Sequence, residues 1–126
     1  MCIRDRYLNY RDKTATPFSA FLNFDDLTVC SYSPERLIKL QDDEITTSPI
    51  KGTIKRGNNE LQDRDLKSYL QNSKKNLAEN LMIVDVLRND ISRVSERGSV
   101  KVTELAKIKS YKNVHHLVST LSLIHI

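Results

Sequence analysis

The sequence is poor in cysteine, in aromatic residues and in long apolar runs, and each shortage excludes a class of function. Its two cysteines are Cys2 and Cys30. Cys2 lies in an N-terminal segment that we expect to be an artefact, so Cys30 has no disulfide partner. This agrees with a reducing compartment such as the cytoplasm. Aromatic residues make up 6% of the chain and are not interleaved with basic ones, which argues against a base-stacking surface. No interior run is apolar enough to span a bilayer.

The charge balance is only mildly basic. The formal net charge is +4, and basic and acidic residues are interspersed. The tight basic group is formed by Lys51, Lys55 and Arg56, beside a Gly-Asn-Asn turn at 57–59. Such a group suits a small dianionic substrate as well as it suits a nucleic-acid phosphate. A basic module that binds nucleic acid therefore stays open as an alternative of a different class.

The two ends of the chain do not resemble natural protein. Residues 1–6 can be encoded by ATG TGT ATA AGA GAC AG, and the reverse complement of that string encodes residues 121–126. Both ends can thus be read from opposite strands of one DNA element, which resembles a transposon-type sequencing adapter. We therefore expect both segments to be artefacts and residues 7–120 to be an interior piece of a longer protein.

Between these ends, the hydrophobic pattern predicts strands, then helices, then strands. Strands are expected at 17–24, 27–32, 36–40, 44–47, 99–102 and 114–120, and 105–111 also favours extended structure. The first half is expected to form an antiparallel meander, and 54–60 a loop with a turn at its glycine. This order predicts an α+β fold in which antiparallel strands pack with helices.

Helical periodicity begins at Leu61, and a stronger helix is predicted over 76–94. The expected apolar faces are Leu66, Tyr69 and Leu70 in the first helix, and Leu77, Leu81, Ile83, Val84, Leu87 and Ile91 in the second. An Arg-Gly pair at 97–98 is typical of a helix stop followed by a turn.

Lys51 is the most informative candidate for chemistry. It lies between Pro49, which fixes φ, and Gly52, which allows close approach of a substrate. An amine that is held in this way and desolvated can lose its proton and act as a nucleophile. A solvated lysine in a turn is the simpler interpretation of these residues alone.

Two glutamates are candidates for supporting roles. Glu35 follows a Ser-Pro pair at the end of a predicted hairpin, where a partly desolvated carboxyl group can serve as a general acid. Glu79 lies near the start of the long helix, where it could bind Mg²⁺ through a carboxylate oxygen. A solvated turn glutamate and a first-turn helix residue are the simpler alternatives.

The remaining polar residues favour structural roles. The run Asp85, Arg88, Asn89, Asp90 and Arg93 is expected to tie the long helix to neighbouring loops. His115 and His116 are adjacent on a predicted strand, so their side chains point to opposite faces and cannot readily chelate one metal. A hydrolytic set of His116 with Ser119 or Cys30 has no supporting local signature.

Several short motifs occur together in one order. They are Ser-Pro-Glu-Arg at 33–36, Pro-Ile-Lys-Gly-Thr at 49–53, Ala-Glu-Asn-Leu-Met-Ile-Val-Asp at 78–85, Arg-Asn-Asp at 88–90, Gly-Ser-Val at 98–100 and Val-His-His-Leu-Val-Ser at 114–119. In this combination the chain resembles the chorismate-utilising enzymes, and the resemblance covers residues 17–120. Within that family Lys51 is typical of the members that make 4-amino-4-deoxychorismate for folate synthesis. Members that make anthranilate, isochorismate or salicylate typically carry alanine there.

The resemblance implies roles for individual residues. Lys51 matches the nucleophile that adds to C2 of chorismate, Glu35 the acid that protonates the departing C4 hydroxyl, and His116 an active-site histidine near C4. Gly52 and Thr53 match substrate-binding positions. Glu79 matches one ligand of the Mg²⁺ that holds the ring carboxylate. A glutamine amidotransferase partner is implied as the source of ammonia.

The chain also departs from the family pattern. Later segments of the family are missing, among them a second metal-binding glutamate and the Tyr and Arg that grip the substrate carboxylates. Residues 7–120 are therefore expected to be a partial chorismate-binding catalytic domain. We expect the piece alone to be inactive and poorly folded, with exposed strand edges. Anthranilate synthase component I stays open as the alternative within the family.

Overall fold

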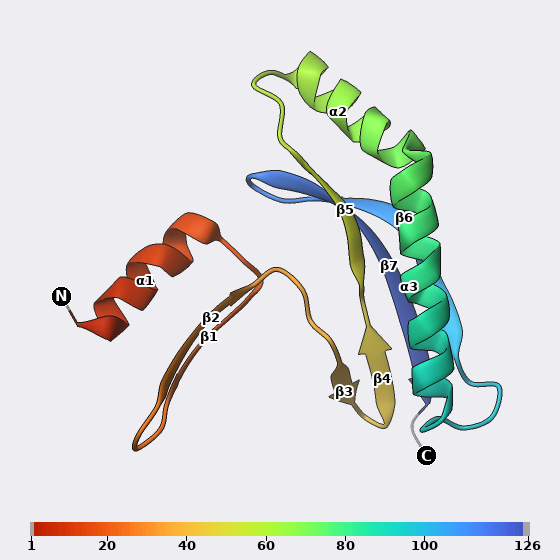
Figure 1. Ribbon diagram of the computed structural model, residues 1–126, viewed down its shortest axis with the longest axis horizontal. Helices are drawn as coiled ribbons and strands as arrows, with labels where there is room; N and C mark the ends of the chain where they lie inside the picture. The colour runs from red at the N-terminus through yellow and green to blue at the C-terminus, as the bar shows by residue number, and fades with distance from the viewer. Residues whose placement is uncertain (1, 125–126) are drawn as a thin grey trace. The chain divides into compact units, whose positions relative to one another are not determined.

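The computed structural model describes residues 2–124. Met1, His125 and Ile126, which belong to the expected adapter segments, lie outside the described residues. Residues 2–124 form three helices and seven strands with antiparallel pairing, which confirms the predicted α+β class (Figure 1). The chain divides into two compact units, the first ending at Arg36 and the second beginning at Leu37.

The first unit consists of a helix and a β-hairpin. Its elements are α1 (Ile3–Thr14), β1 (Phe18–Asn23) and β2 (Thr28–Ser33). The hairpin and its turn at 25–26 confirm the prediction, because β1 and β2 pair without a register shift. Tyr7 of α1 is buried against Phe21 and Tyr32, with ring centroids 5.4 and 5.3 Å apart. The helix itself was not predicted, since part of it falls in the end segment that was set aside.

The second unit is built around one long strand. Its strands are β3 (Lys39–Gln41), β4 (Glu44–Thr47), β5 (Ile50–Lys55), β6 (Lys101–Ser110) and β7 (Val114–Ile124). β7 pairs with β4 and β5 at different positions along its length, and it also pairs with β6. The expected continuous meander is therefore wrong: β2 pairs with β1 in one sheet, whereas β3 and β4 belong to the other. β4 pairs with β7, which lies far along the chain, and nothing in the sequence near β4 indicates that partner.

Three element boundaries also differ from the prediction. Residues 54 and 55 end β5 and do not belong to the loop that follows. The two extended segments predicted within 99–111 form a single strand, β6, which is interrupted by register shifts near Glu104 and by a positive φ of 47° at Ala106. β7 continues to Ile124, through part of the segment expected to be adapter-derived. The adapter origin of that segment stays a prediction.

The two helices of the second unit have side-chain caps at their N-termini. α2 spans Glu60–Asn72 and begins where Asn59 Oδ1 accepts the Gln62 N–H at 2.9 Å. α3 spans Lys74–Ser92 and begins at Ser73, whose hydroxyl accepts the Asn76 N–H at 3.4 Å. Ser and Asn are favoured caps because their oxygens satisfy N–H groups that lack a partner within the helix. Figure 1 shows α3 lying along the sheet beside β5 and β7.

The core of the second unit lies between α3 and β7. Its buried members are Ile45, Val84, Ile91, Leu121 and Leu123. Each buried side chain of this size contributes about 1.5–3 kcal/mol. Two predicted core residues are exposed instead: Tyr69 is 68% and Leu81 48% exposed. The buried face of each helix is rotated about the helix axis relative to the predicted one. In α3 it contains Asn80, Val84 and Ile91, and in α2 it contains Leu70.

Candidate functional site

A β-bulge in β5 places Lys51. Ile50 pairs with Val118, and Thr53 pairs with His116, so that three steps along β5 match two along β7. Lys51 and Gly52 therefore share the place of one residue, as in a β-bulge. Pro49, which precedes the strand, is buried.

Gly52 is required at this bulge for two reasons. Its φ is +91°, which L side chains rarely adopt. A Cβ there would also lie 3.1 Å from Asn76 Cβ and 3.1 Å from Leu70 Cδ1, on the two helices that cover this part of the sheet. The glycine thus lets β5 approach the junction of α2 and α3, and this approach fixes the backbone that carries Lys51.

Lys51 and Glu79 line one pocket. The pocket has a volume of about 240 Å³, and its other lining residues are Met82, Ile83 and Val86 of α3. Lys51 comes from β5 and is exposed, whereas Glu79 comes from the second turn of α3 and its side chain is 46% exposed. Glu79 also lies 3.9 Å from Lys75 Nζ, one turn earlier. The fold therefore brings together an amine and a carboxylate, predicted for different roles, beside apolar side chains.

The described residues do not form a complete metal site. Glu79 offers one hard carboxylate ligand, which Mg²⁺ prefers. Residues 2–124 contain no group of three or more His, Cys, Asp or Glu side chains that could hold a metal ion. A magnesium ion at Glu79 would thus need further ligands from outside residues 2–124 or from a substrate.

His116 lies on β7 next to the bulge. It is 8% exposed, and its Nδ1 shares a hydrogen bond of 2.8 Å with Thr53 Oγ1 on β5. The Tyr111 ring contacts it edge-on, with centroids 5.4 Å apart. His116 is not among the residues that line the Lys51 pocket.

His115 points to the opposite face, as predicted for adjacent residues on a strand. It is 1% exposed, with Nδ1 2.8 Å from Ser110 Oγ and Nε2 3.1 Å from Asp63 Oδ1. An ionised Asp63 can only accept, so Nε2 carries the proton, and in the neutral ring Nδ1 accepts from the serine hydroxyl. His115 is thus a hydrogen-bonded structural histidine.

Glu35 belongs to the first unit. The Ser33 hydroxyl donates to the Glu35 carbonyl at 2.7 Å and accepts the Glu35 N–H at 3.2 Å, which closes a tight turn directly after β2. This turn orders the backbone that carries the carboxyl group. The proposed role of Glu35 as an acid stays a prediction.

Arg56, which belongs to the basic group seen in the sequence, is paired with Asp63 within the chain. Its Nε and Nη2 donate to the two Asp63 carboxylate oxygens, each at 2.8 Å, and its Nη1 donates to the Tyr111 carbonyl at 2.8 Å. The Gly57 N–H adds a bond of 2.7 Å to Asp63 Oδ1. The hydrogen bonds from Arg56, and next that from Gly57, hold the pKa of the Asp63 carboxyl far below its ordinary value.

Asn80 forms a second buried polar contact that the sequence did not indicate. It is 0% exposed on α3, its Oδ1 accepts the Ser119 hydroxyl, and its Nδ2 lies 3.4 Å from the Leu117 carbonyl. Ser119 Oγ also accepts the Ala106 N–H at 2.8 Å. The signal in the sequence is a polar residue on a helical face that is otherwise defined by apolar residues.

The polar run on α3 lines a shallow pocket. Asp85, Arg88 and Asn89 line it together with Ser92, Gly98 and Val100. The expected role of this run in tying the helix to neighbouring loops stays a prediction. Ser92 Oγ donates to the Asn89 carbonyl at 2.7 Å.

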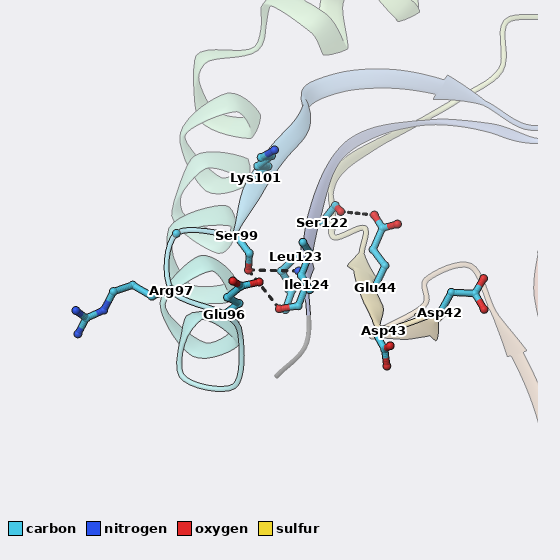
Figure 2. Close-up of a pocket in the computed structure, with 11 residues that line it drawn as sticks. Asp42, Asp43, Glu44, Glu96, Arg97, Ser99, Lys101, Ser122, Leu123 and Ile124 are labelled. Carbon is cyan, nitrogen blue, oxygen red and sulfur yellow. Dashed lines mark hydrogen bonds between the residues drawn. The ribbon is translucent and has the colours of Figure 1, made fainter.

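A larger pocket, of about 630 Å³, lies at the other end of β7 (Figure 2). Glu44 accepts the Ser122 hydroxyl there, and Ser99 bonds to both the N–H and the carbonyl of Ile124 at 3.3 Å. Asp42 and Asp43 point away from this contact (Figure 2). Because Ser122 and Ile124 fall in the expected adapter segment, we do not assign this pocket a function.

The chain belongs to the chorismate binding enzyme family, whose family model matches residues 4–122. It is 54% identical over 106 residues to aminodeoxychorismate synthase component 1 of Salmonella typhimurium, covering 84% of this chain and 23% of that protein. It is 43% identical over 118 residues to anthranilate synthase component 1 of Pseudomonas putida, covering 94% of this chain and 24% of that one. These findings confirm the resemblance seen in the sequence motifs.

Structural comparison agrees. A crystal structure of anthranilate synthase component I from Streptococcus pneumoniae superposes with a TM-score of 0.85 at 31% identity, over 99% of this chain and 27% of that one. The chain thus spans about a quarter of the length of these relatives. Within residues 2–124, no helix is long and apolar enough to cross a membrane.

Proposed function

We propose that the longer protein to which this chain belongs is aminodeoxychorismate synthase component I, which converts chorismate and ammonia to 4-amino-4-deoxychorismate. The observation that carries the proposal is Lys51, presented by the Gly52 bulge at a pocket shared with Glu79. The lysine within Pro-Ile-Lys-Gly-Thr at 49–53 and the 54% identity to a relative of that name support it.

In the proposed reaction Lys51 splits a difficult substitution into two easier steps. Lys51 Nζ forms a bond to C2 of the ring, both conjugated ring double bonds shift, and the C4–oxygen bond breaks. Glu35 donates a proton to the departing hydroxyl, because hydroxide is a poor leaving group. Ammonia then forms a bond to C4, both ring double bonds return to their original positions, and the C2–Nζ bond breaks. His116 would lie near C4, held by its bond to Thr53.

Charge compensation is the other requirement. Chorismate is a dianion, and burying its carboxylates is costly unless cations pair with them. When bound, Mg²⁺ would supply that positive charge at the ring carboxylate. Glu79 is the residue of this chain proposed as one of its ligands, with the others supplied from outside residues 2–124. Gly52 and Thr53 are proposed to contact the substrate.

A partner is required to deliver ammonia, and we propose a glutamine amidotransferase subunit or domain. The site would have to exclude water while ammonia reaches C4, because water attack would return the hydroxyl. We propose the cytoplasm as the working compartment, in line with the low cysteine content.

The test uses the longer protein with chorismate, Mg²⁺ and ammonia. We expect aminodeoxychorismate as the product, and we expect Lys51→Ala to abolish its formation while chorismate still binds. Mass spectrometry of the wild-type enzyme quenched during turnover should find a covalent adduct at Lys51. Unchanged product formation by the Lys51→Ala enzyme would contradict the nucleophile.

Anthranilate synthase component I is the second candidate, because a relative of that name is 43% identical over 94% of this chain. Lys51 opposes it, since that activity typically goes with alanine at this position. Formation of anthranilate by the wild-type longer protein would decide for this candidate.

A further inference from the structure

Asp63 is the centre of a hydrogen-bond network that surrounds the start of β7. Its two carboxylate oxygens accept from Arg56 Nε and Nη2, from the Gly57 N–H and from His115 Nε2. The donors come from the loop between β5 and α2 and from β7, and Asp63 itself lies on α2. Charge-assisted and bidentate bonds are the strong ones, so this carboxylate holds three segments in fixed geometry.

Arg56 extends the network to the turn between β6 and β7. Its Nη1 donates to the Tyr111 carbonyl at 2.8 Å, and its backbone N–H donates to the Asn113 carbonyl at 3.1 Å. The Tyr111 N–H in turn bonds to the Val114 carbonyl at 2.8 Å. Arg56 therefore holds the turn between β6 and β7, and Asp63 in turn holds the guanidinium group of Arg56.

The same turn determines the surroundings of His116. The Tyr111 ring lies edge-on against the His116 imidazole, and His115, the preceding residue, is held by Asp63 and Ser110. Fixing the His115 ring and the Tyr111 backbone also fixes the strand between them. Because adjacent side chains on a strand point to opposite faces, fixing His115 also sets the direction of the His116 side chain, which bonds to Thr53.

We propose that Asp63 is a positioning residue that acts through Arg56, Tyr111 and His115 to hold the imidazole of His116 at the active site. This proposal rests on the proposed function, in which His116 lies near the reacting carbon. A displacement of about 1 Å in a reacting group can cost about a hundredfold in rate. Asp63 itself need not touch the substrate.

The test is a double-mutant cycle in the longer protein, with Asp63→Asn, His116→Gln and the double variant. We expect Asp63→Asn to lower kcat between about 10- and 100-fold, with little change in the KM for chorismate. In the His116→Gln background the same change should have almost no further effect, because its effect passes through His116.

Glu104→Gln is the matched control. Glu104 forms an ion pair of 2.8 Å with Lys109 and accepts the Thr120 hydroxyl at 3.1 Å, on the same two strands, without contacting His115 or Arg56. We expect its kcat to stay within about twofold of wild type. An equal loss of kcat in Asp63→Asn with and without His116, or no loss at all, would overturn the proposal.

Arg56→Lys gives a second, independent variant if Asp63→Asn does not fold. A lysine keeps the charge but cannot bond to both carboxylate oxygens and the Tyr111 carbonyl together. The same loss of kcat, again dependent on His116, is expected, and an effect independent of His116 would overturn the proposal. The product separates the two ideas: if the longer protein makes anthranilate, the proposed function fails, while the cycle still measures positioning on that reaction.

Discussion

The two units of the chain differ in how far apart in sequence their contacts lie. In the first unit, Phe18 to Asn23 pair with Thr28 to Ser33 across a short turn. In the second unit, Ile45 pairs with Leu123 and Ile54 pairs with His115. Local contacts form at little entropic cost, whereas distant ones require closure of a long loop before they contribute. The proposed nucleophile lies in the unit whose geometry depends on distant contacts.

The largest difference is expected between a buried leucine of the second unit and an exposed leucine of the first. Leu117 on β7 is 0% exposed, whereas Leu22 on β1 is 48% exposed. We expect Leu117→Ala to lower the free energy of unfolding of the longer protein by about 2–5 kcal/mol. Leu22→Ala should change it by less than about 0.5 kcal/mol. Denaturant unfolding measures both, and equal losses would show that burial on β7 does not distinguish the units.

The two glycines with positive φ differ in their surroundings, so substituting them tests whether packing between distant segments matters at the Lys51 site. Gly52 at +91° lies against Asn76 and Leu70, whereas Gly98 at +82° has nothing within 4 Å of an added Cβ. Both alanine variants should lose about 1–2 kcal/mol of stability from backbone strain. Gly52→Ala should lose about 1–3 kcal/mol more, because the helices must move.

The activity of these variants sharpens the test. Gly52→Ala should also lower kcat, since the bulge carries Lys51, whereas Gly98→Ala should leave kcat unchanged. Thermal unfolding and steady-state kinetics on the same preparations separate the two effects. A Gly98→Ala enzyme that is as impaired as Gly52→Ala would contradict the packing explanation.

Contacts between residues close in sequence could be predicted from the sequence, whereas contacts between distant segments could not. The β1–β2 hairpin followed from alternation around an Asp-Asp turn, and the α3 helix followed from leucine spacing. The partners of β7 did not follow, because nothing near residue 45 or 54 specifies a strand that begins at 114. Lys51 was found from its neighbours Pro49 and Gly52. Its pocket with Glu79 required the packing of α3 on β5, and the contacts of Asp63 required three separate segments.

The two units also differ in their polar side-chain pairs, one of which is buried and the other exposed. Asn80 and Ser119 are both 0% exposed and lie on α3 and β7, whereas Asn23 Oδ1 accepts the Thr28 hydroxyl at 2.7 Å on the exposed end of the hairpin. We expect Asn80→Ala to cost about 1–3 kcal/mol, because Ser119 and the Leu117 carbonyl lose a buried partner. Asn23→Ala should cost less than about 0.5 kcal/mol. Comparable losses, measured by denaturant unfolding, would contradict this difference.

The smallest expected effect is on the pH dependence of stability, and it is tested with two aspartates, Asp63 and Asp12, that have different partners. Asp63 bonds to Arg56, Gly57 and His115, and these contacts lower its pKa in the folded state. A lowered pKa means that the folded state binds the proton less readily than the unfolded chain does. The stabilisation is therefore complete above the ordinary aspartate pKa of about 4, and it is lost as pH falls below that value.

The Asp63→Asn variant should accordingly be less stable at pH 7 and lose less stability than wild type on acidification below about pH 4. Asp12, whose exposed pair with Arg11 is formed between adjacent residues, is the matched control: Asp12→Asn should leave the stability at pH 7 almost unchanged. Thermal melts of the three proteins across this pH range measure the difference. Parallel curves for Asp63→Asn and wild type would mean that the pKa of Asp63 is the same in the folded and unfolded states, and the contacts of Asp63 would then contribute no pH-dependent stability to the second unit.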